Sequence, residues 1–309
     1  MLVLDADAPE IVAVLRGQVP ADVVLDGVQE AADLADRDDA RVCLGRPDLV
    51  AAAADRLPGL EWVQSTWAGV RPLLPLLAAR AGIIATAPKG IFGDAMAEYV
   101  LGWLVALDRR LLDYVDQQRE RRWARLPDRG LAGRRVLVLG TGSIGARVAE
   151  QLAAFGMEVV GVSRSGRPHP AFTRTWPTSE RLAAARDAHV LVNTLPETNA
   201  TVGIVDAALL SVLAAGAVLF NVGRGSAIGQ SALLDAIGTG QLSSAVLDVF
   251  EQEPLPAEHP FWATPNIHVT PHVSAPTRRA DIARVFAANL DRWRSGRALE
   301  GVVDPEAGY

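Results

Sequence analysis

The chain has 309 residues, a formal net charge of −6 at pH 7 and a hydrophobic fraction of 50%. This length allows two domains with sizeable cores, and no uncharged apolar run reaches the roughly 18 residues expected of a membrane-spanning helix. The acidic balance, without a basic stripe, argues against nucleic acid as the main partner. The single cysteine, Cys43, excludes an internal disulfide and is typical of a reducing, cytoplasmic location.

Residues 1–93 alternate short apolar runs with helical patterns, which predicts a small α/β domain with parallel strand pairing. The N-terminus carries acids where a signal peptide would be apolar. The candidate strands are 23–25, 40–44, 62–65 and 83–85, and the candidate helices are 47–54 and 72–81.

A long helix is predicted over 91–110, and it is apolar nearly all round. A helix without a polar face is buried in a core or an interface. We therefore expect a hinge helix that also packs against a partner subunit, which predicts a homodimer. Residues 117–130 are rich in arginine and predict a linking loop with a solvated surface.

The stretch from Arg135 to Gly145 reads as a buried strand that runs into Gly140-x-Gly142-x-x-Gly145, followed by a helical pattern and a second apolar strand at 159–162. In such a unit the glycines permit a tight turn and a close approach of a pyrophosphate to the N-terminus of the helix. The sequence therefore predicts a dinucleotide-binding unit. The alternative is a glycine-rich turn of another α/β protein, which the complete unit disfavours.

The residues after this second strand predict which dinucleotide binds. An NAD-binding unit usually places Asp or Glu here to bind the ribose hydroxyl, whereas this chain has Ser163, Arg164 and Ser165, followed by Arg167. A guanidinium and two hydroxyls suit a 2′-phosphate, so NADP is expected, with NAD possible. The alternative is a solvated basic loop without a phosphate preference.

Later apolar runs predict strands at 189–193, 217–222, 244–249 and 267–270, with helices at 206–213 and 230–238. Together with 135–139 and 159–162 they make six strands, the length of a doubly wound sheet. A final helix is predicted over 277–294, and the tail at 301–305 is expected to rejoin the first domain. The predicted domains are 1–93 plus 285–309 and 94–284, with hinge helices near 91–110 and 277–294.

Three reactive side chains follow three of these predicted strands. Arg224 follows the strand 217–222, Glu253 follows 244–249 and His272 follows 267–270. Ligands of open α/β sheets bind beyond the carboxyl ends of the strands, so these groups predict an acid–base and anion-binding site at the nicotinamide. The alternative is three unrelated loop residues.

The ordered motifs resemble the D-isomer-specific 2-hydroxyacid dehydrogenase family, and the narrower likeness is to its glyoxylate/hydroxypyruvate reductase branch. The match runs from Gln64–Val70 to Gly308-Tyr309 and is carried by the segments 138–145, 220–225, 247–255 and 270–274. The resemblance implies a Rossmann-type doubly wound parallel sheet inserted in a smaller, flavodoxin-like α/β substrate domain. It also implies closure of the two domains around the substrate.

The resemblance implies roles for individual residues. Arg224 would bind the 2-oxoacid, His272 would exchange the proton, and Glu253 would hydrogen-bond the imidazole and favour its charged form. Asp248 would contact the nicotinamide amide. Substrate contacts are expected from Arg224, His272 and the backbone of Ala68, Gly69 and Val70. Cofactor contacts are expected from Gly140, Gly142, Ser143, Ile144, Gly145, Ser163, Arg164, Ser165, Leu195, Pro196, Thr201, Val222, Gly223, Asp248 and Ser274.

The expected activity is NADPH-preferring reduction of a 2-oxoacid such as glyoxylate, hydroxypyruvate or a larger acid. Two alternatives stay open: a nicotinamide-sensing binding protein on the same fold, and an NAD-linked relative such as phosphoglycerate dehydrogenase.

Arg71, where the family commonly has Asp, favours acidic substrates or forms a salt bridge. Trp67 and Trp262 would wall the substrate pocket or fill a core. His268 and His272 are four residues apart, a spacing that brings two metal ligands together on a helix. They lie on a strand and the turn that follows it, so no metal site is expected.

Overall fold

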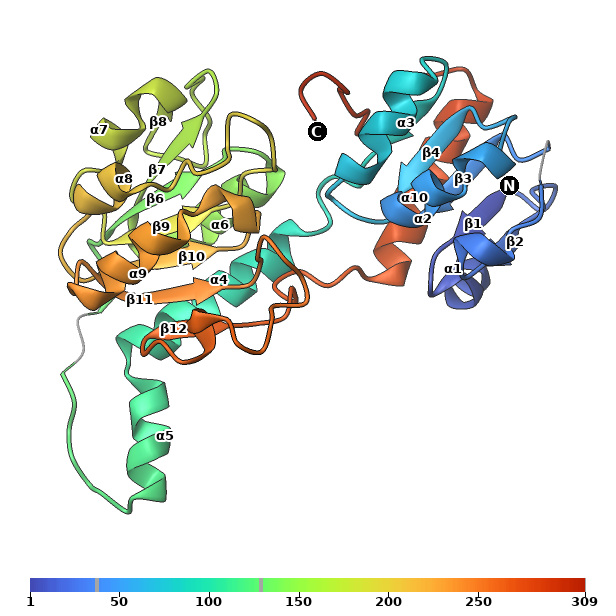
Figure 1. Ribbon diagram of the computed structural model, residues 1–309. Coiled ribbons are helices and arrows are strands. Elements are labelled where there is room, and N and C mark those ends of the chain that lie inside the picture. The colour runs from blue at the N-terminus through green and yellow to red at the C-terminus, as the bar shows by residue number, and fades with distance from the viewer. Residues whose placement is uncertain (37–38, 128–129, 309) are drawn as a thin grey trace. The chain divides into compact units, whose positions relative to one another are not determined.

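The computed structural model describes residues 1–36, 39–127 and 130–308 (Figure 1). Tyr309, with which the predicted family match ends, lies outside the described residues. The chain forms two compact units. Unit 1 comprises Met1–Ile91 and the chain from Thr277 onward, and unit 2 comprises Phe92–Pro276.

The second domain boundary was predicted between residues 284 and 285, and this position is wrong. The structure divides the chain between Pro276 and Thr277. Helix α10 (Arg279–Arg294) buries Ile282, Ala283 and Phe286 in a core of unit 1. Because the apolar face of the helix is continuous, the whole helix belongs to one unit.

Unit 1 contains a parallel five-stranded sheet in the order β2-β1-β3-β4-β5. This is the strand order of flavodoxin-like folds, so the predicted flavodoxin-like architecture is confirmed. The strands are β1 (Leu2–Leu4), β2 (Asp26–Val28), β3 (Val42–Gly45), β4 (Trp62–Ser65) and β5 (Ile84–Thr86).

The first two strands differ from the prediction. The sequence Asp-Gly-Val of β2 has weak strand propensity, whereas the neighbouring apolar run 23–25 was predicted as the strand. The structure pairs Leu2 with Asp26 and Leu4 with Val28, and β1 itself was not predicted. Pairing with a fully buried neighbour therefore overrides local propensity here.

The helices of unit 1 cover both faces of its sheet. Helix α1 (Ala8–Leu15) and α10 pack on one face, and α2 (Pro47–Ala52) and α3 (Leu74–Ala79) pack on the other. The tail returns to the edge strand β5, where Ala87 N donates to Gly301 O at 2.8 Å and Val303 N donates to Ala85 O at 2.9 Å. The expectation that the tail rejoins the first domain is confirmed.

Unit 2 contains a parallel seven-stranded sheet in the order β12-β11-β10-β9-β6-β7-β8. This is the doubly wound order of dinucleotide-binding folds, which confirms the predicted fold class. The strands are β6 (Arg135–Leu139), β7 (Glu158–Ser163), β8 (Arg174–Pro177), β9 (Val190–Asn193), β10 (Ala217–Asn221), β11 (Leu242–Leu247) and β12 (Ile267–Val269).

The sequence predicted six of these strands and missed β8. This edge strand has the sequence Arg-Thr-Trp-Pro and is not fully buried at any position. A short, half-polar edge strand that ends in proline gives no clear periodicity. Its pairing with β7 completes the sheet.

Two groups of helices cover the sheet of unit 2 (Figure 1). Helix α4 (Gly93–Asp108) and α6 (Ser143–Ala154) pack on one face, against the side chains of Val136 and Val138. The other face is covered by α7 (Arg181–Ala185), α8 (Ala207–Ser211) and α9 (Gln230–Gly238). Arg224, Glu253 and His272 follow the carboxyl ends of strands in this sheet.

The segment after α4 is a second helix, α5 (Leu111–Arg119), which was not predicted. The predicted loop 117–130 therefore begins later, at residue 120, and its residues 128–129 lie outside the described part of the chain. In Figure 1, α5 stands away from the sheet of unit 2. Its side chains expose large apolar groups, at Leu111 (47%), Leu112 (40%) and Val115 (48%).

None of the helices in the described part of the chain is both long enough and apolar enough to cross a membrane.

Candidate active site

The glycine-rich turn after β6 has the geometry of a phosphate cradle. Gly140 has a φ of 102°, in the range that disfavours side chains. A Cβ on Gly145 would lie 1.9 Å from Gly140 O, so this position requires glycine for the helix to sit close to its strand. A Cβ on Gly142 would meet nothing within 4 Å, so the space in front of α6 is open. Ser143 and Ile144 begin α6, and their backbone lies at its positive N-terminus.

The residues predicted to select the cofactor form a tight turn after β7. Gly166 N donates to Ser163 Oγ at 3.2 Å, and Arg167 N donates to Ser165 Oγ at 3.4 Å. Thr175 of β8 donates to Gly166 O at 3.0 Å, which fixes the turn to the edge strand. The side chains of Arg164 and Ser165 are exposed on this turn.

The remaining predicted cofactor residues lie in loops after β9 and β10. Thr201 Oγ1 donates to Pro196 O at 2.7 Å, which closes the loop that carries Leu195. Val222 is buried, and a Cβ on Gly223 would lie 2.7 Å from Leu195 O. The two loops therefore touch, and both lie at the carboxyl edge of the sheet.

Arg224 is positioned by a pair of buried amides. Asn193 Nδ2 donates to Asn221 Oδ1 at 2.9 Å, and Asn221 Nδ2 donates to Arg224 O at 3.0 Å. The Arg224 guanidinium donates to Gly223 O at 2.6 Å and is half-buried. Burial lowers the pKa of Arg224, and the charge of Glu253 opposes this effect. A partly desolvated cation of this kind binds anions more strongly than an exposed one.

The structure brings His272 and Glu253 together. His272 Nδ1 lies 2.8 Å from Glu253 Oε2, and Phe250 N donates to Glu253 Oε1 at 2.9 Å. A carboxylate only accepts hydrogen bonds, so Nδ1 carries the proton and Nε2 is left for a ligand. A Cβ on Gly225 would lie 1.9 Å from the carbonyl carbon of Phe250, so the Arg224 and Glu253 loops are in direct contact.

Asp248 organises the loop that carries His272. Its fully buried carboxylate accepts from Thr270 Oγ1 at 2.6 Å, from Val273 N at 2.9 Å and from Ser274 N at 2.9 Å. Its backbone carbonyl accepts from His272 N at 2.9 Å. The Asp248 side chain thus holds the loop through three hydrogen bonds. Its contact with the nicotinamide amide stays a prediction.

Two residues that the sequence did not single out join this cluster. Tyr99 of α4 places its hydroxyl 2.6 Å from Thr270 Oγ1. Trp103, one turn later on α4, packs against the ring of His268 in a tilted arrangement, with 5.0 Å between the ring centroids. The sequence predicted Tyr99 as part of the apolar helix over 91–110. Its hydroxyl was the one signal that set it apart from the apolar residues of that helix.

The predicted substrate loop, Ala68–Val70, follows β4 in unit 1. Ala68 is exposed and Val70 is buried, so the segment runs from the surface into the core. A cavity of about 200 Å³ lies within unit 1 and is lined by residues that directly follow strands β1, β3 and β4. Its lining includes Asp5, Arg46, Thr66 and Trp67.

Neither of the two tryptophans considered for the substrate pocket fills a core. Trp67 is 38% exposed, and the guanidinium carbon of Arg46 lies 4.7 Å from the centroid of its ring. Trp262 is 54% exposed, and its indole donates to Pro256 O at 2.9 Å. Arg71 begins a short 3₁₀ turn directly after the loop, and its side chain is exposed.

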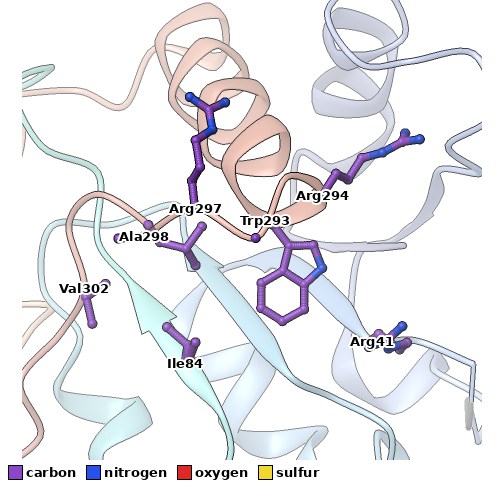
Figure 2. Close-up of a pocket in the computed structure, with 9 residues that line it drawn as sticks. Arg41, Ile84, Trp293, Arg294, Arg297, Ala298 and Val302 are labelled. Carbon is purple, nitrogen blue, oxygen red and sulfur yellow. The ribbon is translucent and has the colours of Figure 1, made fainter.

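A second cavity in unit 1, of about 770 Å³, contains none of the predicted site residues. Figure 2 shows Trp293 of α10, Ile84 of β5 and Val302 of the tail around it, with arginines at the rim. Ile84 begins its strand, so the cavity includes the opposite end of the sheet from the predicted substrate loop. Within the described ranges, no three His, Cys, Asp or Glu residues gather where they could hold a metal ion.

Comparisons with known proteins agree with this geometry. Residues 101–274 match the family model described as D-isomer specific 2-hydroxyacid dehydrogenase, NAD binding domain. Glyoxylate/hydroxypyruvate reductase A of Escherichia fergusonii is 37% identical over 217 residues, which are 70% of each chain.

Two solved structures are similar over nearly the whole chain. A D-isomer specific 2-hydroxyacid dehydrogenase family protein of Aeromonas salmonicida is 39% identical, with a TM-score of 0.91 and 98% of each chain covered. The NADPH-dependent glyoxylate/hydroxypyruvate reductase of Sinorhizobium meliloti, solved with NADP and sulfate, is 30% identical. Its TM-score is 0.88, with 100% of this chain and 99% of that chain covered.

Proposed function

Because this chain is an oxidoreductase of the D-isomer specific 2-hydroxyacid dehydrogenase family, we propose that it reduces 2-oxoacids to D-2-hydroxyacids with NADPH. The observation that carries the proposal is the 2.8 Å contact between His272 and Glu253, in loops that touch the loop of Arg224. An acid–base group beside a fixed cation is what reduction of a carbonyl next to a carboxylate requires.

The three side chains divide the reaction among them. Arg224 binds the carboxylate and the carbonyl oxygen of the acid through its fork of donors. His272 gives the proton on Nε2 to that oxygen as the carbon is reduced. Glu253 accepts from Nδ1, which orients the imidazole and leaves Nε2 for the substrate.

The cofactor residues fit NADPH. The open space at Gly142 and the N-terminus of α6 suit a pyrophosphate, and the exposed Arg164 and Ser165 suit a 2′-phosphate. NADPH, when bound, supplies the hydride. The NADP in the Sinorhizobium meliloti reductase supports the same preference here, and NAD remains a second cofactor.

Replacing Arg164 with aspartate should shift the preference towards NADH. The substitution removes a guanidinium and adds a carboxylate, which repels a 2′-phosphate and accepts from a free ribose hydroxyl. We expect the ratio of kcat/KM for NADPH to that for NADH to fall at least about tenfold. Arg186→Asp, on another exposed position of unit 2, makes the same charge change and should leave the ratio unaltered. An unchanged ratio in Arg164→Asp would place the selector elsewhere.

The test of the function itself is the decay of nicotinamide absorbance with NADPH and with NADH. The acids to compare are glyoxylate, hydroxypyruvate, pyruvate and phenylpyruvate, since the relatives named as reductases act on the first two. We expect rapid oxidation of NADPH with at least one of them. Tight NADPH binding without turnover on any acid would instead support a nicotinamide-sensing protein.

We also propose a homodimer, now through α5 rather than α4. The apolar residues of α4 are accounted for within unit 2, because Met96, Val100 and Leu104 pack in the core it shares with α6. Several exposed apolar side chains gather on α5, and Trp123, which follows this helix, is 101% exposed. Apolar groups gathered on a helix that stands away from its unit are typical of an interface.

An aspartate at Leu112 should therefore weaken the dimer. Burying an added carboxylate in an apolar interface is unfavourable, so we expect a shift to monomers by light scattering at micromolar concentration. Leu182→Asp is the matched control, since Leu182 is 37% exposed on α7 of the same unit. A wild-type protein that is monomeric at every concentration would refute the proposal.

A further inference from the structure

A chain of hydrogen bonds joins helix α4 to the loop of the proposed catalytic histidine. The hydroxyl of Tyr99 lies 2.6 Å from Thr270 Oγ1, and Thr270 Oγ1 lies 2.6 Å from Asp248 Oδ1. The same carboxylate accepts from the amides of Val273 and Ser274, on the far side of His272, each at 2.9 Å. Asp248 is fully buried, so water does not compete for these bonds.

The direction of the two hydroxyl protons follows from the donors available. Thr270 has one hydroxyl proton, and the carboxylate of Asp248 can only accept it. Thr270 Oγ1 must then accept the hydroxyl proton of Tyr99. Burial, reinforced by the charge of Asp248, raises the pKa of Tyr99 to about 12, so its hydroxyl stays protonated as a donor.

These hydrogen bonds stabilise an unfavourable backbone conformation in the loop that carries His272. His272 has a φ of 53°, which few residues other than glycine adopt. Its own amide donates to Asp248 O at 2.9 Å. The Asp248 carboxylate thus accepts hydrogen bonds from residues on both sides of His272, and the orientation of the imidazole depends on these bonds.

We infer that Tyr99 is a positioning residue for His272, acting through Thr270 and Asp248. The inference rests on the proposed 2-oxoacid reduction, in which His272 transfers the proton. Tyr99 can hold its end of the chain because α4 is anchored in the core by Val100 and Leu104, both fully buried. The contact between the tilted rings of Trp103 and His268 joins the same helix to β12, just before Thr270.

The first test needs no turnover. Thr270→Val keeps the shape of the side chain but removes the hydroxyl, which leaves Tyr99 and Asp248 Oδ1 each without this partner. Hydrogen exchange of the Val273 and Ser274 amides should then be at least about tenfold faster, as expected from the loss of one buried hydrogen bond. Thr270→Ser restores the hydroxyl and should restore slow exchange. Unchanged exchange in Thr270→Val would overturn the inference, whether or not the protein reduces any acid.

The second test separates positioning from folding. We expect Tyr99→Phe to lower kcat about three- to tenfold and Thr270→Val about tenfold or more, with an unchanged dissociation constant for NADPH. Thr239→Val is the matched control, because Thr239 caps the distant helix α9 through Asp235 O at 2.9 Å. Its kcat should equal that of the wild type.

The decisive comparison uses His272→Ala as the background. If Thr270 acts through His272, Thr270→Val causes no further loss of the residual single-turnover rate in that background. An additional loss equal to that in the wild type would overturn the inference and leave the proposed reaction standing. A wild-type protein inactive on all four acids would instead count against the proposed function. The hydrogen-exchange experiment would still test whether Thr270 and Asp248 hold the loop of His272.

Discussion

Replacing His272 with alanine should lower kcat by about 10²- to 10⁴-fold, the range expected for loss of a positioned general acid. The side chain contributes the proton on Nε2. Within the part of the chain that the structure describes, no other titratable side chain is hydrogen-bonded to Glu253. NADPH binding should be retained, because the phosphate cradle at Gly140–Gly145 lies on other strand ends. The measurements are kcat with the best acid and the quenching of tryptophan fluorescence by NADPH.

Two further variants sharpen this result. His169→Ala removes another imidazole of unit 2, whose Nδ1 accepts from Ala171 N at 3.2 Å, and should leave kcat unaltered. Glu253→Gln keeps an acceptor for Nδ1 but removes the charge, so it should lower kcat by less than His272→Ala does. Wild-type turnover in His272→Ala would reject this residue as the proton donor.

Replacing Arg224 with alanine should reduce kcat/KM by about 10³-fold, equivalent to roughly 4 kcal/mol. This is the loss expected when two charge-assisted hydrogen bonds to a substrate disappear. KM for the acid should rise together with the fall in kcat, since the guanidinium binds the substrate as well as the developing oxyanion. Steady-state kinetics over a wide range of acid concentrations separates the two parameters.

Arg224→Lys tests whether charge alone suffices. Lysine keeps the cation but lacks the planar fork, so it should recover only part of the lost kcat/KM. NADPH affinity and thermal stability serve as controls, because Asn221 Nδ2 still donates to the backbone carbonyl of residue 224 in both variants. Nearly wild-type values of kcat and KM in Arg224→Ala would refute its proposed role.

The unit around Gly140–Gly145 was predictable because its function constrains its sequence directly. A tight turn and a close helix–strand contact both require glycine, and the structure shows these demands at Gly140 and Gly145, whereas the space beside Gly142 is open. Strands β4 and β6 were likewise predicted with the bounds they have in the structure, since they are buried apolar runs.

Elements that depend on their neighbours were predicted poorly. Strand β2 forms on weakly strand-prone residues because it pairs with β1, and β8 forms because the edge of β7 is available. Helix α5 carries exposed leucines next to charges, and Gln117 is its one buried residue. Local propensity spans about 1 kcal/mol per residue, which tertiary contacts readily exceed.

The sequence by itself determined the order of the motifs, the doubly wound and flavodoxin-like classes, and the strand ends at which Arg224, Glu253 and His272 lie. Only the tertiary structure decided that Glu253 and His272 meet at 2.8 Å, that α10 lies wholly within unit 1, and that Tyr99 reaches Thr270. The reason is physical: periodicity assigns a residue to a strand or helix face, whereas hydrogen-bonded pairs depend on the packing of segments far apart in the sequence. Tyr99 and Thr270 are separated by 171 positions along the chain.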